Sequence, residues 1–360
     1  MSEWQETTLG DVITLQRGHD LAKTEMQFGS IPVAGSNGVI GYHNKATTKA
    51  LGITIGRSGN IGNPHLYKED FWAHNTTLYV KDFKGNDEIF VYYLLKSIDF
   101  AGFNVGSAVP TLNRNHIHPM VIQKPLPEEQ KAIASILSSL DDKIDLLHRQ
   151  NTTLERMAET LFRHWFVEEA QDDWEEKPLS SIANFLNGLA CQKFPPTDAI
   201  NKLPVLKIKE LSSGISENSD WATSNVKPEY IVENGDVIFA WSASLMVKVW
   251  DGEKCVLNQH LFKVTSQGFP KWFYLYWCKY HLDEFVSISL SHATTMGHIK
   301  RGDLDTAMVK VPKPQELALM TEQMTPLLEK QIINAKQIKT LEKLRDNLLP
   351  KLMSGEVRVL

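Results

Sequence analysis

The segment TLERMAETLFRHWFVE at residues 153–168 has a counterpart, TLEKLRDNLLPKLMSGE, at residues 340–356, an offset of 187 in the numbering. At the same offset, KPLPEEQ (124–130) aligns with VPKPQEL (311–317), and two prolines coincide. One offset shared by separate segments is typical of an internal repeat. The sequence therefore predicts two related halves, each of which ends in the same kind of segment.

The offset changes towards the start of each half. WQETTLGDVITLQRG from Trp4 aligns with WEEKPLSSIANFLNG from Trp174 at an offset of 170, and NTTLYV from Asn75 aligns with NQHLFK from Asn258 at an offset of 183. Insertions and deletions in surface loops produce such changes between conserved elements. The pattern indicates a tandem duplication with a period of about half the chain.

Length and composition agree with two soluble domains. A chain of 360 residues exceeds the size at which one hydrophobic core stops growing, and 42% of its residues are hydrophobic. It has no run of about 18 apolar residues, and the first residues, MSEWQETTLGD, do not resemble a secretory signal. We therefore expect a cytoplasmic protein without a membrane segment. The spacing of Cys191, Cys255 and Cys278 indicates buried, reduced thiols rather than a zinc site.

The formal net charge of −5 is unusual for a nucleic-acid-binding protein, because such domains are usually basic. The charge is unevenly distributed. Residues 126–170 contain five Lys and Arg against nine Asp and Glu, whereas residues 1–125 contain eleven of each. Part of the negative charge therefore lies in one helical segment, and the globular regions can still carry local basic surfaces.

Each half begins with short β-type segments, such as ITIG at 53–56 and DVIFAW at 236–241, between loops rich in Gly, Asn and Ser. A long helical pattern follows, over 126–168 in the first half and 314–353 in the second. We expect a mixed α/β (α+β) fold with two tandem-repeat domains separated by two long antiparallel helices that form a coiled coil. The alternative is that each helix packs only on its own domain.

Apolar residues recur every seven positions along the first long helix, and more loosely along the second. An antiparallel register that places Asn151 opposite Asn334 aligns most of both patterns. Two amides can satisfy each other there, whereas a slip would leave each against an aliphatic side chain. Leu140 opposite Arg345 and Leu154 opposite Gln331 are weak points. The positions that define the register are Asn151, Asn334, Leu147, Ile338, Leu154 and Leu341.

Catalytic motifs are missing from the sequence. GRSGNIG at 56–62 lacks the Lys and Ser/Thr of a phosphate-binding P-loop, and neither the glycine motif nor the catalytic motif of amino-methyltransferases is present. HIH at 116–118 has no third ligand at a useful spacing, and loop histidines are the simpler interpretation. A recognition protein is favoured. The alternatives are a protein-interaction scaffold on a coiled coil, and an enzyme with divergent motifs.

Two parts of the chain resemble a known family. The stretch from Gly106 to Phe166, which contains PLPEEQ, LDDKID and ERMAETLFRHWF, is similar to the end of a target-recognition domain and the central conserved region of type I restriction-modification specificity subunits. ATTMGHIKRGDL, KVPKPQELAL and the closing LLPKLMSGE resemble the same block repeated. The resemblance covers essentially the whole chain. One departure is Pro326, which lies within the expected second helix, where proline usually kinks or breaks a helix.

The resemblance implies a non-catalytic subunit that reads an asymmetric, bipartite DNA sequence. Each target-recognition domain would read one half-site, and the helix pair would set the spacer between them. A helix over 128–166 is about 58 Å long at 1.5 Å per residue, which suits half-sites roughly one turn of DNA apart. The expected regions are a first domain (1–125), a central helix (126–168), a second domain (169–313), a distal helix (314–353) and a tail (354–360).

The resemblance also implies partners. Double-stranded DNA is the ligand, two methyltransferase subunits would bind S-adenosylmethionine, and restriction and translocation subunits would use ATP and magnesium. The chain itself is expected to hold no cofactor and no metal.

Candidate DNA-binding residues fall in aligned places of the two halves. Arg57, Ser58 and Asn60 of the glycine-rich loop align with Trp241, Ser242 and Ser244, and arginine and asparagine can read guanine and adenine in the major groove. Arg114 and its counterparts suit phosphate contacts, because shared residues cannot distinguish unlike half-sites. Any one of them could instead be an ordinary surface side chain. The full candidate set is Arg57, Ser58, Asn60, Arg114, Trp241, Ser242, Lys248, Lys300 and Arg301.

The repeat also predicts a cyclic arrangement. The segment from Phe166 to Trp174 joins the first long helix to the second domain, and the residues after Met353 together with those before Trp4 would form a similar bridge. We therefore expect Met1 and Leu360 to lie close together.

Overall fold

The computed structural model describes residues 4–103, 111–291 and 297–359. The chain forms two compact units. Unit 1 comprises Met1–Lys143 together with Leu341–Leu360, and unit 2 comprises Ile144–Thr340. The boundary crosses both long helices, so each of these helices belongs to unit 1 at one end and to unit 2 at the other.

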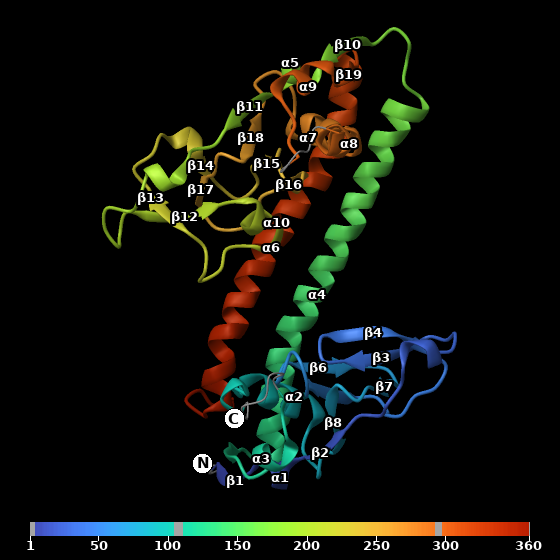
Figure 1. Ribbon diagram of the computed structural model, residues 1–360, viewed down its shortest axis with the longest axis vertical. Coiled ribbons are helices and arrows are strands. Elements are labelled where there is room, and N and C mark those ends of the chain that lie inside the picture. The colour runs from blue at the N-terminus through green and yellow to red at the C-terminus, as the bar shows by residue number, and fades with distance from the viewer. Residues whose placement is uncertain (1–3, 104–110, 292–296, 360) are drawn as a thin grey trace. The chain divides into compact units, whose positions relative to one another are not determined.

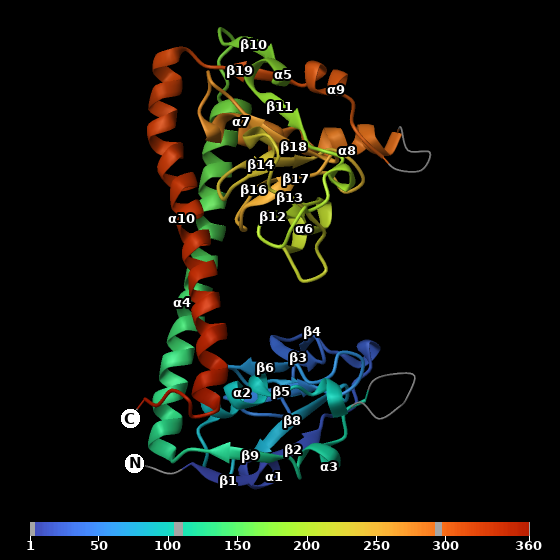
Figure 2. The ribbon, with the colours of Figure 1, turned by 90° about the vertical axis from the view of Figure 1, so that its left-hand side faces the viewer.

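Unit 1 contains three small sheets (Figures 1 and 2). The strand orders are β1-β9, β2-β8-β5-β6 and β4-β3-β7. The strands are β1 (Gln5–Thr8), β2 (Thr14–Arg17), β3 (Ile31–Gly35), β4 (Gly38–His43), β5 (Gly52–Gly56), β6 (Pro64–Tyr67), β7 (Trp72–Ala73), β8 (Thr77–Asp82) and β9 (Val121–Lys124). The short helices are α1 (Leu9–Val12), η1 (Lys23–Glu25), α2 (Glu88–Ser97), η2 (Ala101–Phe103) and α3 (Arg114–Ile117).

Local sequence explains where these helices begin. The Thr8 side chain caps α1 together with Asp11 in a reciprocal capping box. Asp87 caps α2 by accepting from the backbone N–H of Phe90 at 2.8 Å. Figure 2 shows α2 beside β5 and β6, where its apolar face is buried.

Unit 2 repeats this plan. Its strand orders are β10-β19, β11-β18-β15-β16 and β13-β12-β17-β14. The strands are β10 (Glu175–Pro178), β11 (Asn184–Asn187), β12 (Lys202–Leu206), β13 (Trp221–Thr223), β14 (Ile231–Val232), β15 (Val237–Ala240), β16 (Met246–Val249), β17 (Cys255–Leu257), β18 (Leu261–Thr265) and β19 (Met308–Val311). The helices are α5 (Leu179–Ile182), η4 (Cys191–Lys193), α6 (Ile208–Ser213), η5 (Pro228–Tyr230), α7 (Lys271–Tyr280), α8 (Leu282–Ser291) and α9 (Arg301–Thr306).

Strand pairing confirms the duplication. Leu15 pairs with Val80 in unit 1, and Phe185 pairs with Val264 in unit 2. Leu15 and Phe185 are counterparts at the offset of 170, and Val80 and Val264 are counterparts at an offset of 184. The mixed α/β fold with two related halves is therefore as the sequence predicts.

The offset of 183 that aligned Asn75 with Asn258 is wrong by one position. His74 bridges to His19 in unit 1 as Asn258 bridges to Leu189 in unit 2, which gives an offset of 184. A shift of one position would turn every side chain of the strand to the other face of the sheet. The match between Asn75 and Asn258 was misleading, because the strand register is fixed by the backbone hydrogen bonds and not by residue identity.

The two long helices are α4 (Pro127–Arg163), which continues into the π-helical turn η3 (His164–Glu168), and α10 (Pro314–Met353). Pro127 and the two glutamates after it suit the start of α4, because proline has no N–H to leave unpaired and negative charge is favoured there. Pro326 put in doubt the continuity of the second helix near its start, and α10 is continuous through it. Pro326 therefore removes a backbone hydrogen bond without ending the helix.

Parts of both long helices belong to the core of each unit. In unit 1, Ile133 and Leu137 of α4 and Leu352 of α10 are buried in one cluster with residues from the sheet and α2. In unit 2, Phe162 and Met324 belong to an aromatic cluster, in which the Phe162 ring lies 5.1 Å from that of Trp277, edge to face. Because these helix residues pack against the domains, the heptad pattern alone predicts only the contacts between the two helices and not those between helix and domain.

The first and last described segments meet in unit 1. A Cβ added to Gly355 would lie 3.2 Å from the Trp4 ring. Arg358 donates from Nε and Nη2 to the two carboxylate oxygens of Glu129, at 2.5 and 2.7 Å. These contacts join the tail to the start of α4. The sequence predicts that Met1 and Leu360 lie close together, but both residues lie outside the described residues.

Candidate nucleic-acid interface

The glycine-rich loop of unit 1 connects β5 to β6 and is held by backbone hydrogen bonds. The N–H groups of Arg57 and Ser58 donate to the Thr76 oxygen at 2.8 and 3.2 Å, and the Leu112 N–H donates to the Arg57 oxygen at 2.8 Å. Gly59 and Gly62 have φ values of +82° and +77°, which favour glycine. Asn60 lies between them and is exposed. The loop therefore presents side chains from a fixed backbone.

Unit 2 builds the same arrangement with different residues. The Ile299 N–H donates to the Trp241 oxygen at 3.1 Å, as Leu112 does to Arg57. Ser242 forms a β-bridge with His298, as Ser58 does with Thr111. The alignment of Arg57 with Trp241 that we made from the sequence is thereby confirmed.

A cavity of about 530 Å³ in unit 1 brings three arginines together. Arg57 donates from Nη1 to the Asn75 oxygen at 3.3 Å, and Arg114 donates from Nη1 to the Leu15 oxygen at 3.2 Å. The third arginine, Arg17, was missed by the sequence analysis. Its position directly before Gly18, in a segment that aligns between the halves, was the available signal. The lining is basic enough to attract an anionic ligand.

The counterpart of this place in unit 2 is aromatic. Trp241 donates from Nε1 to Oδ1 of Asn187 at 3.2 Å. Its ring stacks on that of Phe262, with centroids 5.6 Å apart, and is nearly perpendicular to the His298 ring, whose centroid lies 6.3 Å away. Ser242 is buried and its hydroxyl lies 3.1 Å from His260 Nδ1. Equivalent backbone thus carries guanidinium groups in unit 1 and an indole in unit 2.

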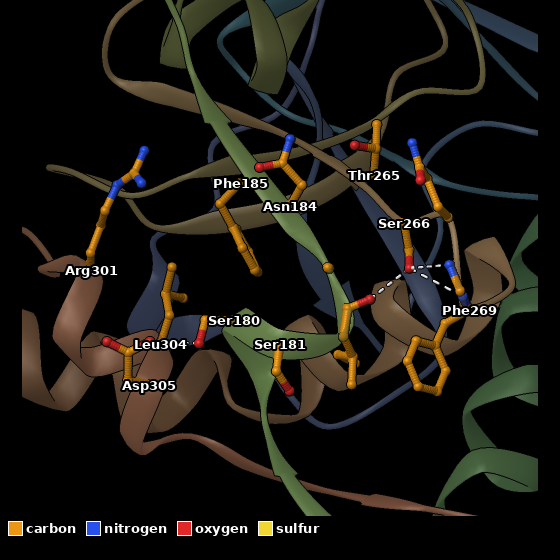
Figure 3. A pocket seen from close by; sticks show the side chains of 14 residues that line it. Ser180, Ser181, Asn184, Phe185, Thr265, Ser266, Phe269, Arg301, Leu304 and Asp305 are labelled. Carbon is orange, nitrogen blue, oxygen red and sulfur yellow. Dashed lines mark hydrogen bonds between the residues drawn. The ribbon is translucent and has the colours of Figure 1, made fainter.

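Arg301 lies at a groove of about 740 Å³ along β11 (Figure 3). In this view Asn184 and Phe185 project from β11, with Arg301 and Asp305 from α9 at one end of the groove and Ser266 at the other. The Ser180 hydroxyl donates to Asp305 at 2.5 Å, and Ser266 donates to the Ile182 oxygen at 2.6 Å.

In unit 1 the position that corresponds to one end of this groove is filled by the side chains of His118 and Lys84. His118, the counterpart of Asp305 at the offset of 187, accepts through Nε2 from the Leu15 N–H at 3.1 Å. Lys84 donates to the Gly10 oxygen at 2.5 Å. Burial lowers the pKa of His118, and the charges of Arg114 and Lys84 lower it further, which agrees with an Nε2 that accepts a hydrogen bond. His118 therefore has a structural role, because it accepts a hydrogen bond from a backbone N–H of the edge strand β2.

Lys300 and Lys248 lie in different surroundings. Lys300 is exposed, and its backbone N–H donates to the Asp303 carboxylate at 2.6 Å at the start of α9. Lys248, on β16, donates to the Leu211 oxygen at 3.4 Å and lies 3.6 Å from Asp251. It lines a separate cavity of about 250 Å³ that contains none of the other DNA-binding candidates. The structure does not bring Lys248 together with them.

The helix register is visible within unit 2. Nδ2 of Asn334 donates to Oδ1 of Asn151 at 2.9 Å, as the sequence register requires. Leu147 and Ile338 are buried, whereas Leu154 is partly buried at a groove that Lys330 also lines. Leu341 belongs to unit 1 and is partly buried there.

Membrane segments and metal clusters are absent from the described residues. No helix among them is long and apolar enough to cross a lipid bilayer. No group of three His, Cys, Asp or Glu side chains within the same ranges is arranged to hold a metal ion.

Comparison with known proteins places the chain in a family. The model of the type I restriction modification DNA specificity domain matches residues 1–156 and 171–343. The MjaIX specificity subunit of a type I restriction enzyme from Methanocaldococcus jannaschii is 29% identical over 302 residues, which cover 75% of this chain and 69% of that protein. The MjaVIII specificity subunit from the same organism is 21% identical, with 99% and 93% covered.

A solved structure shares the fold. The crystal structure of a type I restriction-modification S subunit from M. genitalium superimposes with a TM-score of 0.68 at 17% sequence identity, covering 98% of this chain and 96% of that one. Both copies of the repeat are matched by the family model, and the match covers most of the chain. The chain therefore belongs to the family of type I restriction-modification DNA specificity subunits.

Proposed function

We propose that this subunit reads an asymmetric, bipartite DNA sequence, with one half-site read by the first target-recognition domain and the other by the second. The observation that carries the proposal is that one hydrogen-bonded loop is built twice with different side chains. Arg57 and Trp241 start from equivalent backbone positions, yet they offer a base very different chemistry. Two unlike readers on one chain suit two unlike half-sites.

The phosphate contacts of the proposal fall on residues that the two domains share. Arg114 and Arg301 are equivalent and exposed. Arg114 lines the cavity that Arg57 also lines, and Arg301 lines the groove along β11. Lys300 adds a second exposed cation beside Arg301. A shared cation positions the duplex without selecting bases. The helix pair formed by α4 and α10 would then set the number of base pairs between the half-sites.

The chain would direct catalysis without performing it. Two methyltransferase subunits would supply S-adenosylmethionine binding and methyl transfer, and restriction subunits would supply ATP-driven translocation and cleavage with magnesium. In support, the sequence contains no catalytic motif for either reaction. Incubation of the purified chain with DNA, magnesium and S-adenosylmethionine should leave the DNA unmethylated and uncut, and turnover by the chain alone would contradict this part of the proposal.

Selection from random DNA tests recognition itself. The chain, assembled with its methyltransferase subunits, is mixed with a random duplex library, and the bound fragments are sequenced at two salt concentrations. We expect two short fixed segments separated by a constant number of free positions, with affinity that falls steeply as salt rises. A protein-interaction scaffold would instead select no sequence. Enrichment of one continuous segment would also contradict the bipartite proposal.

A further inference from the structure

Arg17 and Asn187 occupy equivalent, fixed positions at the ends of β2 and β11. Arg17 pairs with Leu78 in unit 1, and Asn187 pairs with Phe262 in unit 2. Each is followed by a glycine packed against backbone. A Cβ on Gly18 would lie 2.1 Å from the His74 oxygen, and one on Gly188 would lie 2.2 Å from the Asn258 oxygen. Neither glycine has room for a side chain, and the strand pairing places Arg17 and Asn187 at matching points of the backbone.

In unit 1 the Arg17 side chain is half exposed and belongs to a polar network. Its Nη2 lies 2.7 Å from Oδ1 of Asp20. The same carboxylate oxygen accepts from the Asn75 side chain, and the Asn75 backbone oxygen accepts from Arg57 at 3.3 Å. Arg17 and Arg57 therefore flank one Asp20–Asn75 pair, and both line the cavity described above.

In unit 2 this network is replaced residue by residue. Asn187 stands where unit 1 has Arg17, and Trp241 stands where it has Arg57. The two side chains bond to each other at 3.2 Å. The positions equivalent to Asp20 and Asn75 are Ala190 and Gln259, from the offsets of 170 and 184. Two positive charges and one negative charge are thus absent from unit 2 at this place.

We propose that Arg17 and Arg57 together read a guanine in the first half-site, that Asp20 is the positioning residue of Arg17, and that the Asn187–Trp241 pair removes this guanine requirement from the second half-site. The inference rests on the proposed function and names the residues that make the half-sites differ. A guanidinium fork matches O6 and N7 of guanine in the major groove. A residue that contacts phosphate does not need to differ between the units, as the equivalent pair Arg114 and Arg301 illustrates. Arg17 and Arg57 do differ from their counterparts, which favours a role in reading a base.

The test is the methylated motif in host cells that carry the subunit with its methyltransferase partners. Arg17→Lys keeps the charge but loses the fork, so we expect one guanine position of the first half-site to become degenerate, with discrimination falling roughly 10- to 100-fold. Asp20→Asn should relax the same position to a smaller extent while raising affinity for random DNA, because it removes a negative charge beside the duplex. A purely structural Asp20 would leave the guanine position fixed in the methylated motif. Lys23→Gln, which removes an exposed charge from the same unit, is the matched control and should leave the motif unchanged.

Other outcomes overturn the inference. If Arg17→Lys and Arg17→Gln are folded by circular dichroism and the motif is unchanged, Arg17 does not read a base. Uniform weakening at every sequence would identify a phosphate contact instead. Relaxation in the second half-site would contradict the assignment to the first. These results are distinct from failure of the proposed function, which would appear as a parental complex that methylates no bipartite motif.

Discussion

The side-chain amide of Asn334 donates to the side-chain oxygen of Asn151 at 2.9 Å, and Asn151 donates in turn to the backbone oxygen of Gln331 at 3.2 Å. Asn334 is fully buried. A buried amide pair between two helices favours one register, because any slip places each amide against an aliphatic side chain. Within unit 2, these bonds therefore fix how α10 lies against α4.

Asn334→Leu leaves Oδ1 of Asn151 without its donor in a partly buried site, which costs about 1 to 3 kcal/mol. Removal of Asn334 Oδ1, a buried atom without a hydrogen-bond partner, offsets part of that cost. The double variant Asn151→Leu/Asn334→Leu should lose less than the sum of the single variants. Urea unfolding followed by circular dichroism measures both. Ile333→Ala, at an exposed neighbouring position, is the control and should change stability by less than about 0.5 kcal/mol. Additive losses would show that the two amides are not coupled.

The ion pair between Glu129 and Arg358 should be important for the stability of unit 1. Glu129 is 1% exposed and accepts two hydrogen bonds from the Arg358 guanidinium. Arg358→Ala removes both bonds from a buried carboxylate, and we expect a larger loss in the free energy of unfolding than an exposed ion pair would give. Lys351→Ala breaks only an exposed pair with Glu356 and should cost less than about 1 kcal/mol. Equal effects of the two changes would contradict the structural role of the tail.

Acid should weaken unit 1 through His118. Its pKa is held below the ordinary value of 6.5, chiefly by burial and then by Arg114 and Lys84. Between these two pKa values the unfolded chain binds a proton at His118 that the folded chain does not. The contribution of His118 to the free energy of unfolding is therefore complete above pH 6.5 and is lost as the pH falls towards the lowered pKa. His118→Gln keeps an acceptor for the Leu15 N–H without titrating. Its free energy of unfolding should change less than that of the parent on acidification, and an unchanged slope would exclude His118 as the cause.

Several features could be predicted from the sequence because they are written in local patterns. The duplication, the mixed α/β halves and the contact between Asn151 and Asn334 follow from repeat offsets and heptad spacing. Other features depend on residues distant in the chain. Arg345 was a weak point of the heptad register, yet in unit 1 it pairs with Asp141 at 2.7 Å, and Asp141 also accepts from Tyr93 of α2. Asp141 lies on α4 beside the apolar heptad positions, and its second contact, Tyr93, comes from the domain, so a register built from apolar positions alone includes neither.

The candidate site shows the same limit. The aligned loops of Arg57 and Trp241 were visible because glycine and serine spacing marks them. Arg17 stood in an aligned segment directly before Gly18, but an arginine at the end of a short strand carries no motif, and its significance depends on Asp20 and Asn75 meeting it in the fold. Lys248 had a suitable charge, but the sheet places it in another cavity. Charge alone therefore does not predict which cations share a surface.

The central claim is that each target-recognition domain reads its own half-site. The most direct measurement is methylome sequencing of a host in which residues 1–125 of this subunit are exchanged for the matching region of another family member, with the partners unchanged. The account predicts a motif in which one half and its spacer are retained and the other half is replaced. A motif in which both halves change, or in which neither does, would contradict it.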